Sequence, residues 1–337
     1  MSSFVPRTEF VYKQAATWFP GHMLGALKAM REQMNDIDLV IEARDARLPV
    51  SSRNPLLEEA VGARPRLIVY NKKDLAGDAL DEKMIRSYQP RQKVMFTHSK
   101  NTNNMKQVIR FIKEVAKDID RPIGTRALVV GMPNVGKSTI LNALRHAGVR
   151  KGKAARTGNM PGVTRKVAGS VKILEDPVVF LIDTPGVMIP FVPNPLTMLK
   201  LALAGCIKQD VISSVTIVDY LLFHLNRQPT PPYVEFFKMK EPTNDVDTFI
   251  NHVAKHSGRL LAGGVPDVEN TALHLIDRYR EGKFGVMVLD DQDADAWKRR
   301  IEEEEGVMSR GQQQKVIKAE WKAKRENKYV AKYGKKP

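Results

Sequence analysis

The sequence predicts a doubly wound α/β domain with a mostly parallel sheet, followed by a small helical domain and a basic tail. Three observations predict this class. Short apolar runs of strand type alternate with helical stretches, a glycine-rich loop joins one such run to a helix, and the strand pattern stops near residue 205. Strands that alternate with helices are typical of βαβ units, whose helices cover both faces of a parallel sheet.

The elements of the α/β domain follow from periodicity. The first helix is predicted at residues 22–34, where Leu24, Leu27, Met30 and Met34 recur at steps of three and four. Short apolar runs predict strands at 38–43, 66–70, 93–97, 127–131, 170–174 and 178–182. Between several of these strands, helices are predicted at 79–88, 105–117 and 137–145.

Beyond residue 205 the pattern becomes helical. Helices are predicted at 247–256 and 267–279, with turns at 257–264 and 281–285 and a loop at PTPPY, residues 229–233. The predicted organisation is an N-terminal lead-in at 1–17, an α/β domain at 18–205, a helical domain that binds RNA or the ribosome at 206–290, and a basic tail at 291–337.

Composition narrows the class of protein. The 337 residues include 54 Lys and Arg against 38 Asp and Glu, and the net charge of +16 favours a polyanionic partner such as nucleic acid or an anionic membrane surface. The single cysteine, Cys206, excludes an internal disulfide and a zinc site of clustered cysteines. The most apolar stretch, 199–225, contains four charged residues, so no transmembrane segment is predicted.

The N-terminal segment carries Arg7 and Lys13 against Glu9, with several Ser and Thr. This composition fits a short mitochondrial presequence or an untargeted, disordered lead-in, and the residues alone leave both open.

The clearest motif is GMPNVGKST at residues 131–139, a phosphate-loop pattern between a predicted strand and a predicted helix. The glycines let backbone N–H groups surround phosphates above a helix N-terminus. Lys137 is expected to contact the β- and γ-phosphates, and Ser138 to bind Mg²⁺. The other loop residues expected at the nucleotide are Asn134, Val135, Gly136 and Thr139.

NKKD, residues 71–74, indicates which base is bound. The Asp74 carboxylate can accept hydrogen bonds from guanine N1 and N2, which adenine does not offer. Asn71 would fix the base edge, and the stem of Lys72 would cover the ring. Ser99 follows the next predicted strand, where a second guanine-binding loop belongs. These residues predict GTP or GDP as the nucleotide.

DTPG, residues 183–186, follows the last predicted strand. Asp183 would hold Mg²⁺ through water, and the Gly186 N–H would contact the γ-phosphate. Thr164 lies 19 residues earlier in a basic, glycine-containing loop, which suits a switch threonine that completes the Mg²⁺ shell.

The order of these motifs predicts a circularly permuted chain. Ordinary GTPases carry the phosphate loop first and NKxD last, whereas here NKKD ends 57 residues before Gly131. Permutation is tolerated because the termini of a domain usually lie close together at its surface. The segment after DTPG then leads toward the helical domain, so loss of the γ-phosphate is expected to reorient that domain.

Several stretches resemble the YlqF/RbgA-type circularly permuted GTPases in order and spacing. They are WFPGHM at 18–23, EARDARLPVSSRNP at 42–55, NKKD, GMPNVGKST, PGVTR at 161–165, DTPGV at 183–187, SGRLLAGG at 257–264 and EGKFG at 281–285. The chain looks most like the mitochondrial ribosome-associated branch. The resemblance implies a GTPase that assists assembly of the large ribosomal subunit, with that subunit or its precursor and rRNA as partners. It also implies the mitochondrial matrix, including peripheral association with the matrix face of the inner membrane, and a cytoplasmic location is the alternative.

Catalysis is expected to be slow without help. The position after DTPG, often a water-orienting Gln in GTPases, is Val187, and an apolar side chain cannot orient water by hydrogen bonding. The resemblance suggests Asn134 as the ligand of a K⁺ ion and His22 as the residue that positions water. A loop-shaping role for Asn134 and a turn-capping role for His22 are the alternatives. Lys137, Thr164 and Gly186 complete the predicted catalytic set.

Two classes of function remain open. One is an rRNA-binding assembly factor released or remodelled on GTP hydrolysis, and the other is a GTP-gated scaffold or translation regulator acting through protein or membrane-surface contacts. From Trp297 onward, 13 Lys and Arg face six Glu, a net charge of +7, with four aromatic residues interleaved. Aromatic rings stack on unpaired bases, and residues 310–337 lack the apolar helical face of a membrane anchor, so RNA is favoured.

The DAR sequence after the first predicted strand has a structural interpretation. Arg44, Asp45 and Arg47 are expected to fix the loop between this strand and its neighbour, with a phosphate or RNA contact as the alternative.

Overall fold

The computed structural model describes residues 4–12, 34–54, 57, 60–62, 64–98, 101–149, 169–184, 194–207 and 211–302. The chain divides into two compact units, Met1–Gln292 and Asp293–Pro337. The first unit holds both the α/β elements and the helices that follow them, and the division predicted near residue 205 stays a prediction.

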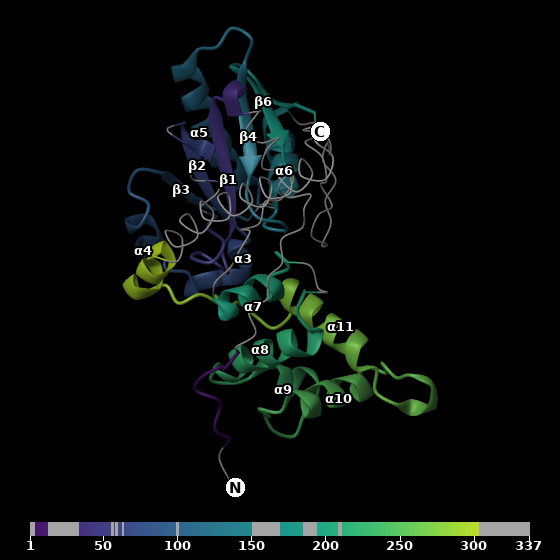
Figure 1. The fold of residues 1–337 in the computed structure, drawn as a ribbon. Coiled ribbons are helices and arrows are strands. Elements are labelled where there is room, and N and C mark those ends of the chain that lie inside the picture. Colours follow the sequence, from purple (N-terminus) through teal and green to yellow (C-terminus); the bar gives the residue numbers. More distant parts are fainter. Residues whose placement is uncertain are drawn as a thin grey trace, which may run out of the picture. The chain divides into compact units, whose positions relative to one another are not determined.

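The described residues contain one six-stranded sheet with the strand order β3-β2-β1-β4-β6-β5. All neighbouring pairs are parallel except β5 and β6, which form an antiparallel pair. The strands are β1 (Leu39–Asp45), β2 (Arg66–Asn71), β3 (Lys93–Phe96), β4 (Thr125–Val130), β5 (Val171–Glu175) and β6 (Val178–Asp183). The predicted mostly parallel α/β fold is therefore confirmed, with each strand within two residues of its predicted bounds (Figure 1).

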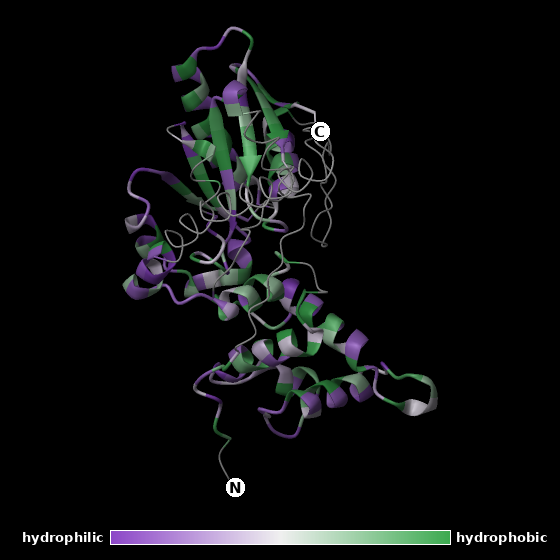
Figure 2. Cartoon of the chain, in the orientation of Figure 1, coloured by the Kyte–Doolittle hydropathy of each residue, from purple (hydrophilic) through white to green (hydrophobic). Residues whose placement is uncertain are grey.

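The sheet is buried because its central strands are apolar on both faces. Every residue of β1 and β2 is buried, as expected for a parallel sheet covered on both sides. Figure 2 shows these strands mostly in the hydrophobic colour. The charged members of the two strands are paired: Arg44 Nε donates to Glu42 Oε1 over 2.6 Å, and Arg66 donates to the other oxygen of Glu42. This pairing offsets the cost of burying the charges.

Helices pack around the sheet and end at recognisable caps. They are α3 (Lys73–Ala76), α4 (Glu82–Ser87), α5 (Thr102–Ile119) and α6 (Lys137–Val149). The Asn101 side chain accepts hydrogen bonds from the first N–H groups of α5, which is the usual role of an N-cap. Of the helix predicted at 22–34, only Met34 lies within the described residues, in the 3₁₀ turn Met34–Asp36. Met34 packs with Ile37, Val40 and Leu128 in one buried cluster.

The second half of the first unit is helical. Its helices are α7 (Pro195–Leu203), α8 (Ser214–Asn226), α9 (Pro232–Phe236), α10 (Val246–His256) and α11 (Val268–Arg280). The predictions for α10 and α11 are confirmed within one residue at each end. The loop prediction at 229–233 is wrong in its last two residues, because α9 begins at Pro232, and the fixed φ of proline suits a first helical turn. None of the helices described here is long and apolar enough to cross a membrane.

The segment after α11 returns to the loop that follows β1. The Asp290 carboxylate accepts hydrogen bonds from the backbone N–H groups of Val50 and Ser51, over 2.9 and 2.7 Å, and from the Ser51 hydroxyl over 2.6 Å. Lys200 Nζ on α7 lies 3.2 Å from the same carboxylate. These contacts join the helical part to the β1 end of the sheet within one compact unit.

Residues 4–12 of the predicted lead-in pack on α8. The Phe10 ring lies 5.1 Å from that of Tyr220 and 5.6 Å from that of Phe223, and Arg7 Nη2 pairs with Asp219 Oδ1 over 2.6 Å. The disordered state that the sequence left open therefore does not describe this segment.

We expect Phe10→Ala to lower the free energy of unfolding by about 1 kcal/mol, since aromatic pairs contribute roughly 0.5–1.5 kcal/mol beyond their buried area. Chemical denaturation measures the loss, and Val11→Ala is the matched control because Val11 is exposed. Equal stability of the two variants would show that the segment contributes nothing to the fold.

Candidate nucleotide-binding site

The phosphate loop joins the end of β4 to the start of α6, as predicted. Gly131 and Gly136 both have positive φ, +140° and +99°. A Cβ at Gly131 would lie 2.2 Å from the carbonyl oxygen of Ala43, and one at Gly136 would lie 2.2 Å from Nδ2 of Asn71. Only glycine fits at these two close approaches. The loop leads directly into the N-terminus of α6. The first N–H groups of a helix lack helical partners and attract anions.

Lys137, the first residue of α6, is buried. Its Nζ donates a 2.8 Å hydrogen bond to the carbonyl oxygen of Met132 in the loop. Burial lowers the pKa of Lys137 to about 8, although the negative charge of Asp183 acts in the opposite direction. A buried ammonium group held by a neutral carbonyl is poorly compensated, so a phosphate oxygen is a better partner for it.

Ser138, in the first turn of α6, meets Asp183 at the end of β6. Asp183 ends β6 and is in register with Val129 of β4, and the Ser138 hydroxyl donates to Asp183 Oδ2 over 2.6 Å. The second carboxylate oxygen, Oδ1, is buried without a hydrogen-bond partner, and burial raises the pKa of this carboxyl group. A hydroxyl beside a carboxylate with an unsatisfied oxygen is a donor set that fits Mg²⁺, which binds oxygen ligands and shares its shell with phosphates and water.

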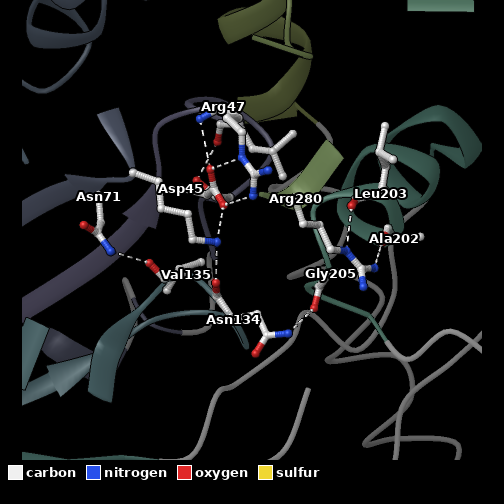
Figure 3. Close-up of polar contacts among 12 residues, drawn as sticks. Asp45, Arg47, Asn71, Asn134, Val135, Ala202, Leu203, Gly205 and Arg280 are labelled. Atoms are coloured by element: carbon white, nitrogen blue, oxygen red, sulfur yellow. Dashed lines mark hydrogen bonds and ion pairs between the residues drawn. The ribbon is translucent and has the colours of Figure 1, made fainter. Parts of the chain in front are cut away.

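NKKD emerges from the end of β2 and contacts the phosphate loop (Figure 3). Asn71 Nδ2 donates to the carbonyl oxygen of Val135 over 3.1 Å. Lys72, which has a left-handed φ of 62°, donates from Nζ to the carbonyl oxygen of Asn134 over 2.6 Å. NKKD and the phosphate loop are therefore held in one arrangement by direct hydrogen bonds.

The Asp74 side chain is 38% exposed, more than those of Asn71 and Lys72. Its Oδ2 lies 3.6 Å from His98 Nε2, and the N–H of Lys73 donates to the carbonyl oxygen of Thr97 over 3.0 Å. Residues 97 and 98 of the predicted second guanine-binding loop thus lie beside NKKD. An accessible carboxylate at this edge can accept hydrogen bonds from a base.

Asp45, at the end of β1, organises the buried side of the site. Its carboxylate accepts from Arg47 Nε and Nη2 over 3.0 and 2.8 Å and from Lys72 Nζ over 2.8 Å. Burial acts to raise the pKa of Asp45, but the charges of Arg47 and Lys72 hold it well below the ordinary value. The loop-fixing interpretation of Asp45 and Arg47 agrees with these contacts, although the ion pair to Lys72 was not predicted.

Four predicted site residues lie outside the described residues: His22, Ser99, Thr164 and Gly186. Val187 and the tail beyond residue 302 do as well. Among the described residues, the structure brings Asn71, Lys72, Val135, Gly136, Lys137, Ser138 and Asp183 to one end of the parallel strands.

A second contact at the site that was not predicted joins Asn134 to the turn after α7. Asn134 Nδ2 donates to the carbonyl oxygen of Gly205 over 2.9 Å, just beyond the end of α7. No motif or periodicity links two residues this far apart in the sequence. The sequence signal at Gly205 is only that a glycine favours the left-handed turn at the end of a helix.

Comparison with known proteins places the chain in a family. A family model described as "50S ribosome-binding GTPase" matches residues 126–255. The protein named "Mitochondrial GTPase 1" of Schizosaccharomyces japonicus is 36% identical to the chain over 320 residues, which cover 88% of the chain and 96% of that relative. The chain belongs to the mitochondrial GTPase 1 family. The resemblance inferred from the motifs is thereby confirmed.

Other members of the family and its bacterial relatives match over similar lengths. "Mitochondrial ribosome-associated GTPase 1" of Xenopus tropicalis is 37% identical over 84% of the chain and 96% of its own length. "Ribosome biogenesis GTPase A" of Bacillus cereus is 35% identical over 81% of the chain and 93% of its own length. The crystal structure of GNP-bound YlqF from T. maritima covers 80% of the chain and 99% of its own chain, at a TM-score of 0.54 and 23% identity, and supports the fold.

Proposed function

We propose that this chain is a mitochondrial GTPase that binds the large ribosomal subunit or its precursor through rRNA and is released or remodelled when GTP is hydrolysed. The observation that carries the proposal is the convergence of the phosphate loop, the Ser138–Asp183 pair and NKKD at one edge of the sheet. Membership of a family that includes "Mitochondrial ribosome-associated GTPase 1" supports the compartment and the class of partner. The matrix, with peripheral contact to the inner membrane, is the proposed location within the mitochondrion.

Each described site residue has a definite task in this proposal. Lys137 exchanges the Met132 carbonyl for phosphate oxygens, and the α6 N-terminus adds backbone N–H groups. Ser138 would hold Mg²⁺ directly and Asp183 through water, and the ion would supply positive charge beside the phosphates. Asp74 accepts from the guanine base, while Asn71 and Lys72 hold the two loops at a fixed separation. Thr164 and the Gly186 N–H are proposed to complete the Mg²⁺ shell and the γ-phosphate contact, and His22 to position the attacking water.

The positive charge of the chain and its helical region support RNA or the ribosome as the partner. A net charge of +16 favours a polyanion, and residues 206–290 are proposed as the part that binds RNA or the ribosome. The test is sedimentation of the protein, loaded with a non-hydrolysable GTP analogue, with purified large subunits and subunit precursors from mitochondria. We expect co-sedimentation that is weaker with GDP. A protein that stays in the supernatant with every particle would contradict the proposed partner and leave the GTPase assignment in place.

We expect turnover to be faster in K⁺ than in Na⁺ at equal ionic strength. The reason is that a K⁺ ion on Asn134 would supply part of the charge of an arginine finger, which is worth 10³–10⁵ in rate, so an effect of about tenfold is reasonable. Phosphate release measured in the two salts checks this, with Asn134→Ala expected to lose the difference. Equal rates in both salts would contradict the cation role and leave GTP hydrolysis untouched.

Deleting residues 297–337 should weaken binding to ribosomal particles and flatten its salt dependence. The deleted segment has a net charge of +7, and each phosphate it neutralises contributes roughly 0.7–0.9 to the slope of log affinity against log salt. GTP affinity should stay the same, because the nucleotide motifs lie before residue 190. Replacement of Lys315, Lys318 and Lys322 by Gln is the control that separates charge from length. An unchanged slope in the deletion would identify a tail that never touches RNA.

A further inference from the structure

Asn134 is held on two sides within the phosphate loop (Figure 3). Its backbone has a left-handed φ of 57°, which is uncommon for a residue other than glycine. The carbonyl oxygen accepts from Lys72 Nζ over 2.6 Å, and side-chain Nδ2 donates to the carbonyl oxygen of Gly205 over 2.9 Å. Because the Gly205 oxygen can only accept, it fixes which end of the Asn134 amide faces it.

Arg280 holds the turn that contains Gly205 at the end of α7. Gly205 follows the end of α7 with a φ of +84°, and a Cβ there would lie 3.1 Å from Arg280 Nε. Arg280 Nε donates to the carbonyl oxygen of Leu203 over 3.1 Å, and Nη2 donates to that of Ala202 over 2.9 Å. The last carbonyls of a helix lack helical partners, and a cation there is favourable for the helix dipole. The Arg280 guanidinium therefore fixes the turn that presents the Gly205 oxygen.

The same end of α11 also reaches the other side of the site. Arg280 is the last residue of α11, and its side chain is only 13% exposed. The preceding residue, Tyr279, has its ring centroid 5.2 Å from the guanidinium carbon of Arg47. Arg47 is bound to Asp45, and Asp45 is bound to Lys72. Two chains of contacts thus run from the end of α11 to Asn134, one to its side chain and one to its backbone carbonyl.

We propose that Arg280 is a positioning residue for the nucleotide site, acting through the α7 turn and Gly205 on Asn134. It does not touch the nucleotide itself; it holds the phosphate loop in its binding arrangement before GTP arrives and so lowers the ordering cost of binding. By linkage, nucleotide binding stabilises the end of α11 by the same free energy. This inference rests on the proposed function, because it requires that the phosphate loop bind GTP.

A double-mutant cycle on nucleotide affinity tests the proposal. We expect Arg280→Ala to weaken GTP and GDP binding by about tenfold, which corresponds to ~1.4 kcal/mol. Asn134→Ala should weaken binding as well, and Arg280→Ala should add little when Asn134 is already replaced, because the two residues act in series. Fluorescent guanine nucleotides titrated into the four proteins give the affinities.

Arg278→Ala is the matched control. Arg278 lies in the same last turn of α11, but its guanidinium carbon is 4.2 Å from the centroid of the Phe236 ring, and the hydrogen bonds to the α7 turn come from Arg280. A general loosening of α11 would weaken nucleotide binding in both arginine variants, whereas the proposal expects the control to bind as the wild type does. Arg280→Lys, which keeps the charge, is expected to restore part of the affinity and serves as the test variant if Arg280→Ala does not fold.

Hydrogen exchange supplies a readout in the opposite direction. GTP should slow exchange of the amides at residues 202–206 and 279–282 in the wild type, and this protection should shrink in Asn134→Ala. Additive effects in the double-mutant cycle, or protection that Asn134→Ala leaves unchanged, would overturn the proposal that Arg280 acts through Gly205 on Asn134. A wild-type protein that binds no guanine nucleotide would instead refute the proposed function, so the two failures are distinguishable.

Discussion

Ser138→Ala and Lys137→Ala are each expected to lower GTP hydrolysis by at least about 10²-fold. Ser138 donates to Asp183, whose second carboxylate oxygen is buried without a hydrogen-bond partner, and this hydroxyl and carboxylate are the groups proposed to hold Mg²⁺. Replacing Ser138 would delete one proposed metal ligand, and replacing Lys137 would delete the cation proposed to bind the phosphates. Losing one preorganised charge-stabilising group commonly costs 10²–10³ in turnover.

The measurement is phosphate release under saturating GTP and Mg²⁺. Ser257→Ala is the control for Ser138→Ala, because the Ser257 hydroxyl also makes one hydrogen bond, to the carbonyl oxygen of Val253, and lies at the end of α10. Circular dichroism should show the same fold in all variants. Full turnover in either phosphate-loop variant would mean that this loop does not bind the reacting phosphates.

Asp74→Asn is expected to weaken GTP binding by about 10²-fold or more, since a site built to hydrogen-bond a polar group discriminates strongly when the pairing is lost. The Asp74 carboxylate is exposed enough to accept from a base, whereas Asn71 and Lys72 are engaged with the phosphate loop and the equally accessible Lys73 ammonium can only donate. An amide in its place turns an N–H toward the donor groups at guanine N1 and N2, so two donors face each other.

The same substitution predicts a gain. Xanthine carries a carbonyl at C2 where guanine carries an amino group, so the amide of the variant can donate to it, and the variant should bind xanthosine triphosphate better than GTP. Isothermal titration with both nucleotides measures the switch. Asp78→Asn is the control, because Asp78 is exposed in the adjoining 3₁₀ turn Gly77–Ala79. Unchanged preference for GTP in Asp74→Asn would remove NKKD from the site.

The sequence predicted the parts of the fold that depend on local pattern. Runs such as RLIVY at 66–70 are short, apolar and bounded by turns, so strand β2 followed directly from its residues. The phosphate loop was predictable because its glycines are required where a side chain would clash. The structure shows such close approaches at Gly131 and Gly136. For both the strand and the loop, the residues that determine the local structure are the same few residues that form the sequence pattern.

Contacts between distant residues were not predictable in this way. The bond from Asn134 to Gly205 and the packing of Phe10 on Tyr220 depend on which surfaces the fold brings together. The start of α9 was missed because two consecutive prolines suggest a loop, although the second is well suited to the first turn of a helix. The ion pair between Asp45 and Lys72 joins two strand ends, and only the strand order reveals that those ends are neighbours.

The strand order has a consequence for how the protein is made. The first three strands form one half of the sheet, from β1 at its centre to β3 at one edge. The last three strands form the other half, from β4, which pairs with β1, to β5 at the opposite edge. NKKD belongs to the half that is synthesised first, and the phosphate loop and Asp183 belong to the half that follows. A guanine nucleotide held by both motifs would therefore span the seam between the segment that is synthesised first and the one that follows. A ligand that binds only the joined halves stabilises them more as its free concentration rises above its Kd, so the nucleotide concentration in the compartment would set the stability of the newly made sheet.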